Sequence, residues 1–494
     1  MKKNPNILFF FTDMQRADTI HALGNPVIKT PNLDRLVKEG TAFTNCYSPS
    51  PVCIPARCCL QYGLYPQKTG LYINGMMPDD NGASYPEILG KNGYKTHAIG
   101  KCHFTPDPTA GRGFHSRMTQ EETIDAKNDD YCKFLKKNGF DNIEPHGFRS
   151  EMYYIPQVST LPAEVHPTQW IGDRSIDFIE ENLSGENPWM MFSSFIHPHP
   201  PLAPPKPWHK LYRAPEMPHP NVPENSELLQ TYINRHQNRY KYRDQGIDKN
   251  LVRTIKAFYY ATISFVDYQI GRVIDSLEKT GQLENTIIIF SSDHGEYLGD
   301  YNCFGKRSMH DSSSKIPLII RYPKSFAENE ICETPVSLID IMPTMLSAAG
   351  IKTNEVELDG EDLSKIASGE CEREVVFSQH GSAGKGIYMI TSKEYKYFYS
   401  AADDKEFLFD KISDPKETHN YAGNPFYIEK QNKLKNKLLD YLKSTNISDA
   451  FVEKNDALKW KKYPYLAGVS NNPDGDLLLQ DDPKSIVKIP GYCK

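Results

Sequence analysis

A cysteine, a proline and an arginine stand close together in residues 53–63, which read Cys-Ile-Pro-Ala-Arg-Cys-Cys-Leu-Gln-Tyr-Gly. A proline two places after Cys53 suits the first turn of a helix, where its missing N–H is not needed. Cys53 would then lie at the N-terminal end of that helix, where free amides and the helix dipole favour an anion. Arg57 would follow one turn later, with a guanidinium suited to hold oxygens around the same point. Taken alone, the segment fits a buried cysteine beside a surface arginine equally well.

Two carboxylates follow apolar runs that we predict to be buried strands. Asp13 follows the run Ile7–Phe11, and Asp293 with His294 follows Thr286–Ser291. Ligands in open α/β sheets bind beyond the carboxyl ends of the strands, so these side chains could meet there. Carboxylate oxygens suit hard cations such as Ca²⁺ or Mg²⁺, and a histidine adds transition-metal character. Taken separately, an aspartate at a strand end is more often a turn or helix cap.

Basic side chains follow two further apolar runs. Lys101 and His103 come directly after Thr96–Gly100, and the segment His-Pro-His-Pro at residues 197–200 follows Trp189–Phe195. A lysine or histidine beyond a strand is usually a surface residue, so neither segment is specific by itself.

Together these segments resemble the formylglycine-dependent sulfatases of the alkaline-phosphatase-like superfamily. The pattern Cys-x-Pro-x-Arg, followed by a leucine and a glycine, is similar to the signature in which that family's cysteine is oxidised after translation. The product is an aldehyde whose hydrate is the nucleophile. Ala56 stands where a serine is commonest, and Tyr62 stands where a threonine is usual. Because Cys53 and Arg57 remain, the resemblance implies that Cys53 is modified and that a formylglycine-generating maturase is a partner.

The resemblance also implies one divalent cation, Ca²⁺ in the first place, with Mg²⁺ or Mn²⁺ as alternatives. The implied ligands are Asp13, the modified Cys53, Asp293 and His294. Many family members have a second aspartate directly after the first, but Met14 stands there in this chain. Gln15 is a guess at the replacement ligand, so the identity of the metal stays open.

Roles for the basic residues follow from the same resemblance. Lys101 and Lys306 would neutralise sulfate oxygens, and His103 would act as a base on the formylglycine hydroxyl. The family's Pro-His-x-Pro setting selects His199 over His197. His199 would bind the bridging oxygen of the substrate and protonate the leaving alcohol.

Two other segments are less specific. His310 follows Lys306 by four residues, at a place where the family usually has a tyrosine, and it is a further substrate-binding candidate. The run Gly381–Gly386 (GSAGKG) superficially suggests a phosphate loop. It lacks the spacing and the Ser or Thr after Gly-Lys that a P-loop needs, so it predicts a turn between strands.

The elements that must position these residues alternate along the first 365 residues. Short runs rich in Ile, Phe, Val and Leu fit strands buried on both faces, and the stretches between them have helical periodicity. The clearest strands are Ile7–Phe11, Thr96–Gly100, Trp189–Phe195, Thr286–Ser291 and Pro317–Arg321. The helices are Asn32–Glu39, Tyr85–Asn92, Asp173–Asn182 and Val252–Thr280. This alternation predicts an α/β fold with a large, mostly parallel or mixed sheet between helices, which the resemblance identifies as alkaline-phosphatase-like.

The pattern changes after about residue 365. Gly386–Ser392 and Tyr395–Ser400 alternate like the strands of a hairpin, Glu406–Asp410 could be a third strand, and Ile428–Leu442 reads as an amphipathic helix. We therefore predict a catalytic domain over residues 1–365. A smaller C-terminal domain of antiparallel sheet plus helix would cover residues 366–494, with a tail that wraps back.

Composition limits the class of protein. A chain of 494 residues exceeds one ordinary core, and 39% hydrophobic with 24% charged residues is typical of a soluble globular protein. A net charge of −6 argues against a general nucleic-acid binder, so an anion site must be a local basic pocket. No stretch approaches the roughly 20 apolar residues of a membrane span. We expect a cytoplasmic protein as the sequence stands, or a periplasmic or secreted one if a leader was removed. The ten scattered cysteines predict reduced thiols.

These inferences predict a sulfatase, an arylsulfatase-like sulfuric ester hydrolase, with a sulfated carbohydrate as the substrate on family grounds. A phosphonate or phosphate ester hydrolase of the same superfamily is the alternative, because similar sites act on phosphorus. An inactive carbohydrate-binding homologue is the alternative from another class, and the intact charged groups argue against it. A serine nucleophile at Ser48 or Ser50 is disfavoured, because neither residue stands in such a motif.

Overall fold

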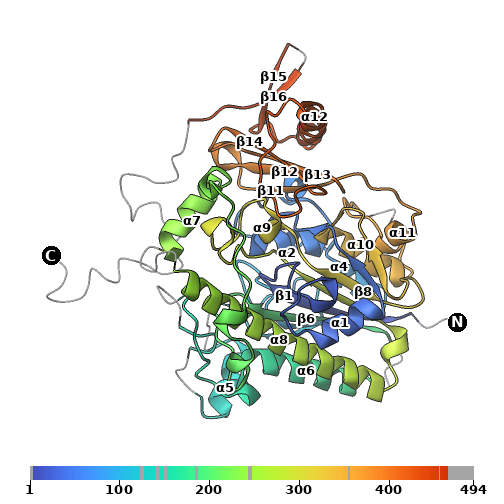
Figure 1. Ribbon diagram of the computed structural model, residues 1–494. Helices are drawn as coiled ribbons and strands as arrows, with labels where there is room; N and C mark the ends of the chain where they lie inside the picture. The colour runs from blue at the N-terminus through green and yellow to red at the C-terminus, as the bar shows by residue number, and fades with distance from the viewer. Residues whose placement is uncertain are drawn as a thin grey trace.

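The computed structural model describes residues 4–122, 127–140, 144–148, 153–183, 187–242, 248–353, 356–455 and 457–464. An eight-stranded sheet crosses the larger part of the molecule, with helices on both sides (Figure 1). The strand order is β5 (Ser116–Thr119), β4 (Lys95–Gly100), β6 (Trp189–Pro198), β1 (Asn6–Asp13), β7 (Thr286–Ser292), β8 (Leu318–Arg321), β2 (Thr41–Phe43) and β9 (Glu330–Cys332). Strand β8 runs against its two neighbours, and the other pairings are parallel. The predicted mixed sheet is confirmed.

Strand β1 shows why both faces of the sheet are covered. Ile7, Phe9 and Phe11 point into one apolar layer, whereas Leu8 and Phe10 point into the other. The first layer includes side chains of α2 (Cys53–Tyr62), α4 (Tyr85–Lys91) and α10 (Ile341–Ala348). The second includes side chains of α1 (Pro31–Lys38), α6 (Pro167–Glu181) and α8 (Lys249–Lys279). Because successive side chains of a strand alternate in direction, a strand buried on both faces is apolar throughout.

A second, antiparallel sheet follows near the C-terminus. Its strands, in spatial order, are β11 (Val376–His380), β12 (Ile387–Thr391), β13 (Tyr395–Ser400) and β14 (Lys405–Asp410). One face packs on α12 (Ile428–Ser444), and the other packs on an aromatic cluster of the larger part of the molecule. The predicted small sheet and helix are confirmed, and the run 381–386 joins β11 to β12 as expected. The boundary at residue 365 stays a prediction, and the predicted tail lies outside the described residues from residue 465 onward.

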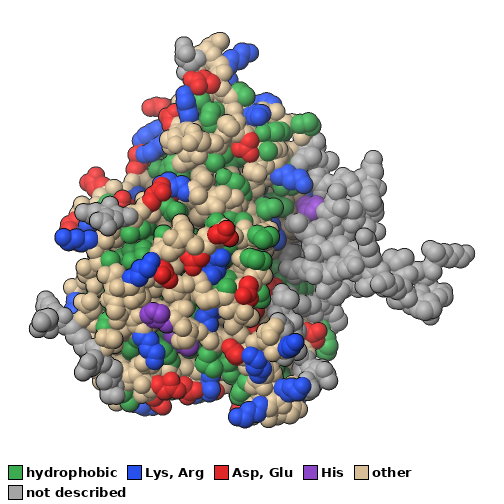
Figure 2. All heavy atoms as spheres, turned by 180° about the vertical axis from the view of Figure 1, so that it is seen from behind, with side chains coloured by type: hydrophobic (Ala, Val, Ile, Leu, Met, Phe, Trp, Pro, Cys, Tyr) green, Lys and Arg blue, Asp and Glu red, His purple; other side chains and the backbone are tan. Residues whose placement is uncertain are grey.

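The remaining elements are short. Apart from single-turn 3-10 helices, they are α3 (Pro66–Thr69), α5 (Asp130–Lys137), α7 (Tyr232–Tyr242), α9 (Asp311–Ser314), α11 (Leu363–Ala367), the strand pair β3 (Cys46–Tyr47) and β10 (Val336–Ser337), and the hairpin β15 (Phe451–Lys454) and β16 (Ala457–Trp460). The nine cysteines within the described ranges are free thiols. None of the helices among those residues combines the length and the apolar character that a bilayer crossing requires. On the face seen in Figure 2, basic and acidic side chains are interspersed.

Candidate active site

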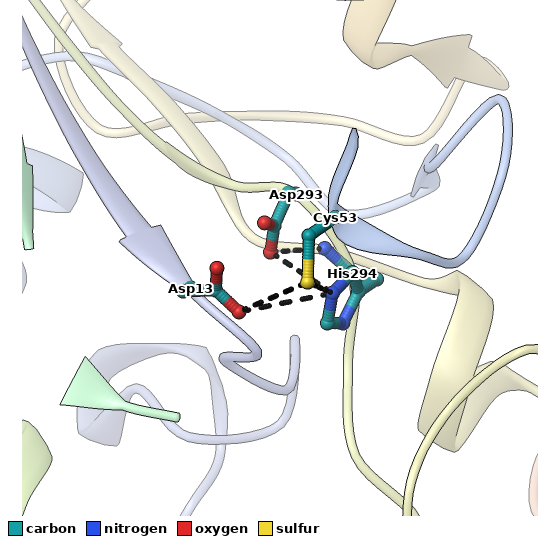
Figure 3. Close-up of side chains that lie close together, drawn as sticks. All are labelled: Asp13, Cys53, Asp293 and His294. Carbon is teal, nitrogen blue, oxygen red and sulfur yellow. Dashed lines mark hydrogen bonds and ion pairs between the residues drawn. The ribbon is translucent and has the colours of Figure 1, made fainter. Parts of the chain in front are cut away.

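The carboxyl ends of β1 and β7 meet the N-terminal end of α2, and four side chains converge there (Figure 3). One potential ligand atom from each of Asp13, Cys53, Asp293 and His294 lies within 4.8 Å of the other three. All four residues are buried. The arrangement offers a cation two carboxylates, one imidazole and the side chain at position 53.

The backbone explains how these side chains are presented. Asp13 is the last residue of β1, Asp293 directly follows the neighbouring parallel strand β7, and Cys53 is the first residue of α2. The Oδ1 atom of Asp293 accepts hydrogen bonds from the backbone N–H groups of Met14 (3.0 Å) and His294 (2.9 Å). The two strand ends are thereby fixed to each other through one of the proposed ligands.

His294 has a ring orientation suited to metal binding. Its Nδ1 lies 3.0 Å from the carbonyl oxygen of Gly295, and a proton on Nδ1 would leave the lone pair of Nε2 free. The Nε2 atom lies 3.3 Å from the Cys53 Sγ, 3.8 Å from an Asp13 oxygen and 3.5 Å from an Asp293 oxygen. Burial and the charge of Asp13 raise the pKa of the Asp293 carboxyl. A divalent cation between the carboxylates would relieve that repulsion, so the donor set fits such an ion.

Arg57 and Lys101 form ion pairs with the carboxylates of the cluster. The buried guanidinium of Arg57 donates to Asp13 Oδ2 at 3.1 Å and to Asp293 Oδ2 at 3.0 Å. The Nζ of Lys101 lies 2.7 Å from Asp13 and 2.7 Å from Glu122. Burial raises the pKa of the Asp13 carboxyl, but Lys101 and the other nearby cations outweigh burial and hold that pKa well below its usual value. No recognised motif contains Glu122, and sequence reasoning missed it.

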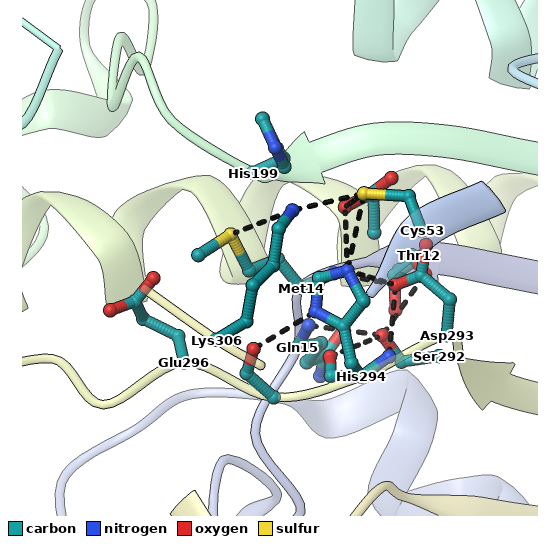
Figure 4. Close-up of polar contacts among 12 residues, drawn as sticks. Thr12, Met14, Gln15, Cys53, His199, Ser292, Asp293, His294, Glu296 and Lys306 are labelled. Atoms are coloured by element: carbon teal, nitrogen blue, oxygen red, sulfur yellow. Dashed lines mark hydrogen bonds and ion pairs between the residues drawn. The ribbon is translucent and has the colours of Figure 1, made fainter. Parts of the chain in front are cut away.

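Lys306 lies directly at the proposed nucleophile (Figure 4). Its Nζ is 2.9 Å from the Cys53 Sγ and 3.9 Å from the Met14 Sδ. Burial and Asp13 raise the pKa of the Cys53 thiol, but Lys306, Lys101 and His294 outweigh them, so this pKa is well below its usual value. The cations around position 53 thus favour a negative charge there.

Met14 occupies the position of the absent second aspartate and has a positive φ of 66°. Its thioether faces Lys306 in Figure 4. Gln15 donates from Nε2 to the Thr19 hydroxyl at 3.3 Å, and its Oε1 has no hydrogen-bond partner among the described residues. The suggestion that Gln15 replaces the missing ligand stays a prediction.

The two histidines beyond β6 differ in their surroundings. His199 lies near Cys53 and Lys306, with its Nδ1 2.7 Å from the Pro200 carbonyl oxygen and its Nε2 3.8 Å from Glu122 (Figure 4). His197 instead contacts the Thr168 hydroxyl at 3.0 Å, and burial lowers its pKa to about 3. The structure therefore brings His199 into the site.

His103 and His310 have surroundings that differ from those of His199. The backbone N–H of His103 donates to the Glu121 carboxylate at 3.0 Å, and its Nδ1 has no partner among the described residues. His310 lies between the two sheets, 2.7 Å from the Tyr297 hydroxyl and 4.6 Å from the Tyr301 ring centre, and burial lowers its pKa to about 3. These contacts of His310 belong to an aromatic core rather than to the metal-ligand cluster. Its role in substrate binding stays a prediction.

Comparison with known families shows the class of this protein. The family model described as Sulfatase matches residues 5–351. The chain belongs to the sulfatase family. A second model, described as N-sulphoglucosamine sulphohydrolase, C-terminal, matches residues 299–444 of this sulfatase. The predicted membership and the predicted class, sulfuric ester hydrolase, are confirmed.

Individual relatives cover nearly the whole sulfatase chain. An arylsulfatase of Clostridium perfringens (strain 13 / Type A) is 28% identical over 98% of this chain and 99% of its own. The multifunctional alkaline phosphatase superfamily protein PehA of Trinickia caryophylli is 30% identical over 85% of this chain and 92% of its own. The crystal structure of the phosphonate monoester hydrolase of Agrobacterium radiobacter superimposes with a TM-score of 0.75 at 23% identity, covering 93% of this chain and 100% of the other. The last similarity shows the shared fold.

Proposed function

We propose that this sulfatase removes sulfate from a saccharide ester through a formylglycine made from Cys53. The convergence of position 53 with Asp13, Asp293 and His294, and with the Lys306 ammonium 2.9 Å away, carries the proposal. In the conversion a maturation enzyme supplies the oxidant. The Cys53 side chain loses its sulfur and two hydrogens and gains one oxygen. A saccharide substrate is supported by the 26% identical N-acetylglucosamine-6-O-sulfatase of Bacteroides thetaiotaomicron, which aligns over 87% of this chain.

The metal we propose is a single divalent cation, with Ca²⁺ first and Mg²⁺ or Mn²⁺ as alternatives, because two carboxylates in the ligand set suit hard cations. Asp13, Asp293, His294 and the modified residue 53 would hold it. When bound, such an ion acts as a Lewis acid that stabilises developing negative charge. The chain's own residues supply the remaining chemistry.

Of the cations around residue 53, one would act on the nucleophile and two would bind the substrate. Arg57, fixed by both carboxylates, lies one turn along α2 and would favour the ionised hydroxyl of the aldehyde hydrate. Lys101 and Lys306 would bind the sulfuryl oxygens, where charge accumulates during transfer. His199 would protonate the departing alcohol oxygen. His103 would then remove a proton from the second hydroxyl, so that sulfate leaves and the aldehyde returns.

The two histidine roles predict different substrate dependence. Replacing His199 by alanine should reduce turnover of a sugar sulfate about 10²- to 10⁴-fold more than turnover of an activated aryl sulfate, because a weakly basic phenolate needs little protonation. Replacing His103 by alanine should slow both substrates to a similar limit, since it acts after the alcohol has left. Steady-state kinetics on one aryl and one sugar sulfate measure the difference. Mass spectrometry should show sulfated enzyme in His103→Ala.

His197→Ala is the matched control for the first histidine, because this neighbour contacts Thr168 away from the cluster. It should show no dependence on the leaving group. Equal losses on both substrates for His199→Ala, together with no trapped sulfate in His103→Ala, would show that the roles are assigned wrongly.

A phosphonate monoester hydrolase is the second candidate function. PehA, 30% identical, is named as a multifunctional member of the superfamily, and two phosphonate monoester hydrolases share the fold. We expect one matured preparation to have a higher kcat/KM on an aryl sulfate than on the corresponding aryl phosphonate monoester, because the model of the sulfatase family matches residues 5–351. A clear preference for the phosphonate would favour the second function.

A further inference from the structure

Arg307 is a cation that the proposed reaction does not use. Its half-buried guanidinium donates from Nη1 to Gln237 Oε1 at 2.9 Å. Among the described residues, no carboxylate forms an ion pair with it. Even partial burial costs an arginine some hydration of its charge, and an acidic partner usually offsets that cost. Here burial lowers the pKa of Arg307, and Cys53 and Tyr153 are among the groups that act on it.

The backbone places Arg307 beside the reaction centre. Its N–H donates to the carbonyl oxygen of Pro51 at 2.9 Å, two residues before Cys53. The preceding residue, Lys306, places its Nζ 2.9 Å from the Cys53 Sγ. Gln237 of α7, which accepts from the Arg307 guanidinium, also donates to the carbonyl oxygen of Lys306, and Cys53 is among the groups that act on the charge of Arg307, so the guanidinium is on the side of residue 53.

The C-terminal sheet contributes a second group at the same place. The N–H of Gln379, in strand β11, donates to the carbonyl oxygen of Pro49 at 3.0 Å, so this strand is fixed to the segment that leads into α2. The next residue, His380, is buried, and its Nδ1 has no hydrogen-bond partner among the described residues. Burial, and then the charge of Arg307, lower the pKa of His380 to about 3. A buried ring with an unpartnered nitrogen is thus within electrostatic reach of an unpaired guanidinium.

The distribution of charge indicates what these groups would bind. Arg57 and Lys101 are paired with the carboxylates of the cluster. In the described part of the chain, Lys306 and Arg307 make no ion pair. A sulfate monoester carries one negative charge, and Lys306 is already positioned to meet it. Arg307 remains available for a second negative group, which its planar guanidinium can bind through two hydrogen bonds.

We propose that Arg307 and His380 form a second anion subsite beside residue 53, which selects saccharides carrying a carboxylate or a further sulfate besides the sulfate removed. This inference rests on the proposed sulfatase function and names its substrate class. Carboxylate and sulfate both present negatively charged oxygens that a guanidinium can bind. The two groups are therefore distinguished by experiment.

Three defined substrates with the same cleavable sulfate test the subsite: an otherwise neutral saccharide, one with an added uronic carboxylate, and one with an added sulfate. We expect the wild-type enzyme to prefer at least one of the two dianionic substrates. Arg307→Gln should lower kcat/KM on that substrate about 10- to 100-fold, as loss of a hydrogen bond between charged groups does, and leave the neutral saccharide nearly unchanged. His380→Asn should lower it in the same direction.

Lys385→Gln is the matched control, because it removes one exposed positive charge near β11 without a contact to the site. It should not discriminate between the substrates. Calorimetric binding of the same saccharides to Cys53→Ala, with and without Arg307→Gln, gives a readout that does not require turnover.

The outcomes separate the subsite from the proposed function. An enzyme inactive on all three sulfates would refute the function, whereas an active one without a dianion preference would overturn the subsite alone. Equal losses on neutral and dianionic substrates in Arg307→Gln and His380→Asn would also overturn it.

Discussion

Cys53→Ala is expected to lower kcat for a sulfate ester about 10⁵- to 10⁶-fold, the loss that accompanies removal of a covalent nucleophile. The reason lies in the geometry at residue 53. Lys306 is 2.9 Å from its Sγ, and Asp13 and His294 lie within 3.8 Å, so the machinery is arranged around an atom that alanine lacks. Replacing a residue that only lines the pocket would leave far more activity than Cys53→Ala.

The control for this variant lies in the same helix. Cys58 is a buried thiol in the apolar layer under the sheet, and Cys58→Ala should leave kcat close to that of the wild type. Peptide mass spectrometry of the active wild-type enzyme should show residue 53 without its sulfur and with one oxygen gained, and residue 58 as a thiol. An active preparation in which residue 53 is entirely a thiol would exclude the formylglycine mechanism.

The sequence predicts most accurately the strands that are buried on both faces. The apolar run in β1 is a strand that is covered on both faces, and Asp13, the first charged residue after this run, lies at the carboxyl end of the strand. The same logic located Asp293. The edge strands β5 and β9, and β2 beside β9, have only three or four residues each, which is too short to show a period, and these strands were not predicted.

The parts of the site that escaped prediction come from irregular backbone. Glu122 follows β5 in a segment without periodicity, and only the folded chain shows its carboxylate 2.7 Å from Lys101. Arg307 has a φ of 82°, and its environment depends on strand β11, more than 60 residues later in the sequence. A second basic residue directly after Lys306 was the available signal. Motif position also has limits, because His310 stands in register with the family pattern yet packs into an aromatic core.

Asp293→Asn is expected to lower kcat/KM about 10³- to 10⁴-fold and to reduce the bound metal, since Lewis-acid stabilisation of the transition state contributes several kcal/mol. Asparagine keeps an oxygen that can accept from the backbone N–H groups of Met14 and His294, so the strand ends should remain joined. It removes the charge that would face the cation and presents an amide to Arg57. Metal content by mass spectrometry is measured together with the kinetics.

Thermal unfolding provides a test of the same site that is independent of turnover. When the free concentration of an ion is 100 times its Kd, binding stabilises the folded state by about 2.7 kcal/mol. Chelation should therefore lower the Tm of the wild type. The effect should be larger than for an ordinary surface ion, because removal leaves Asp13 and Asp293 buried together and the pKa of Asp293 is already raised by burial and by its neighbour. In Asp293→Asn that repulsion is absent, and chelation should change the Tm little. Asp18→Asn changes an exposed carboxylate in the segment after Asp13, and this variant should respond to chelation as the wild type does. Full activity and an unchanged Tm in chelated wild-type enzyme would refute the assignment of a metal to this cluster.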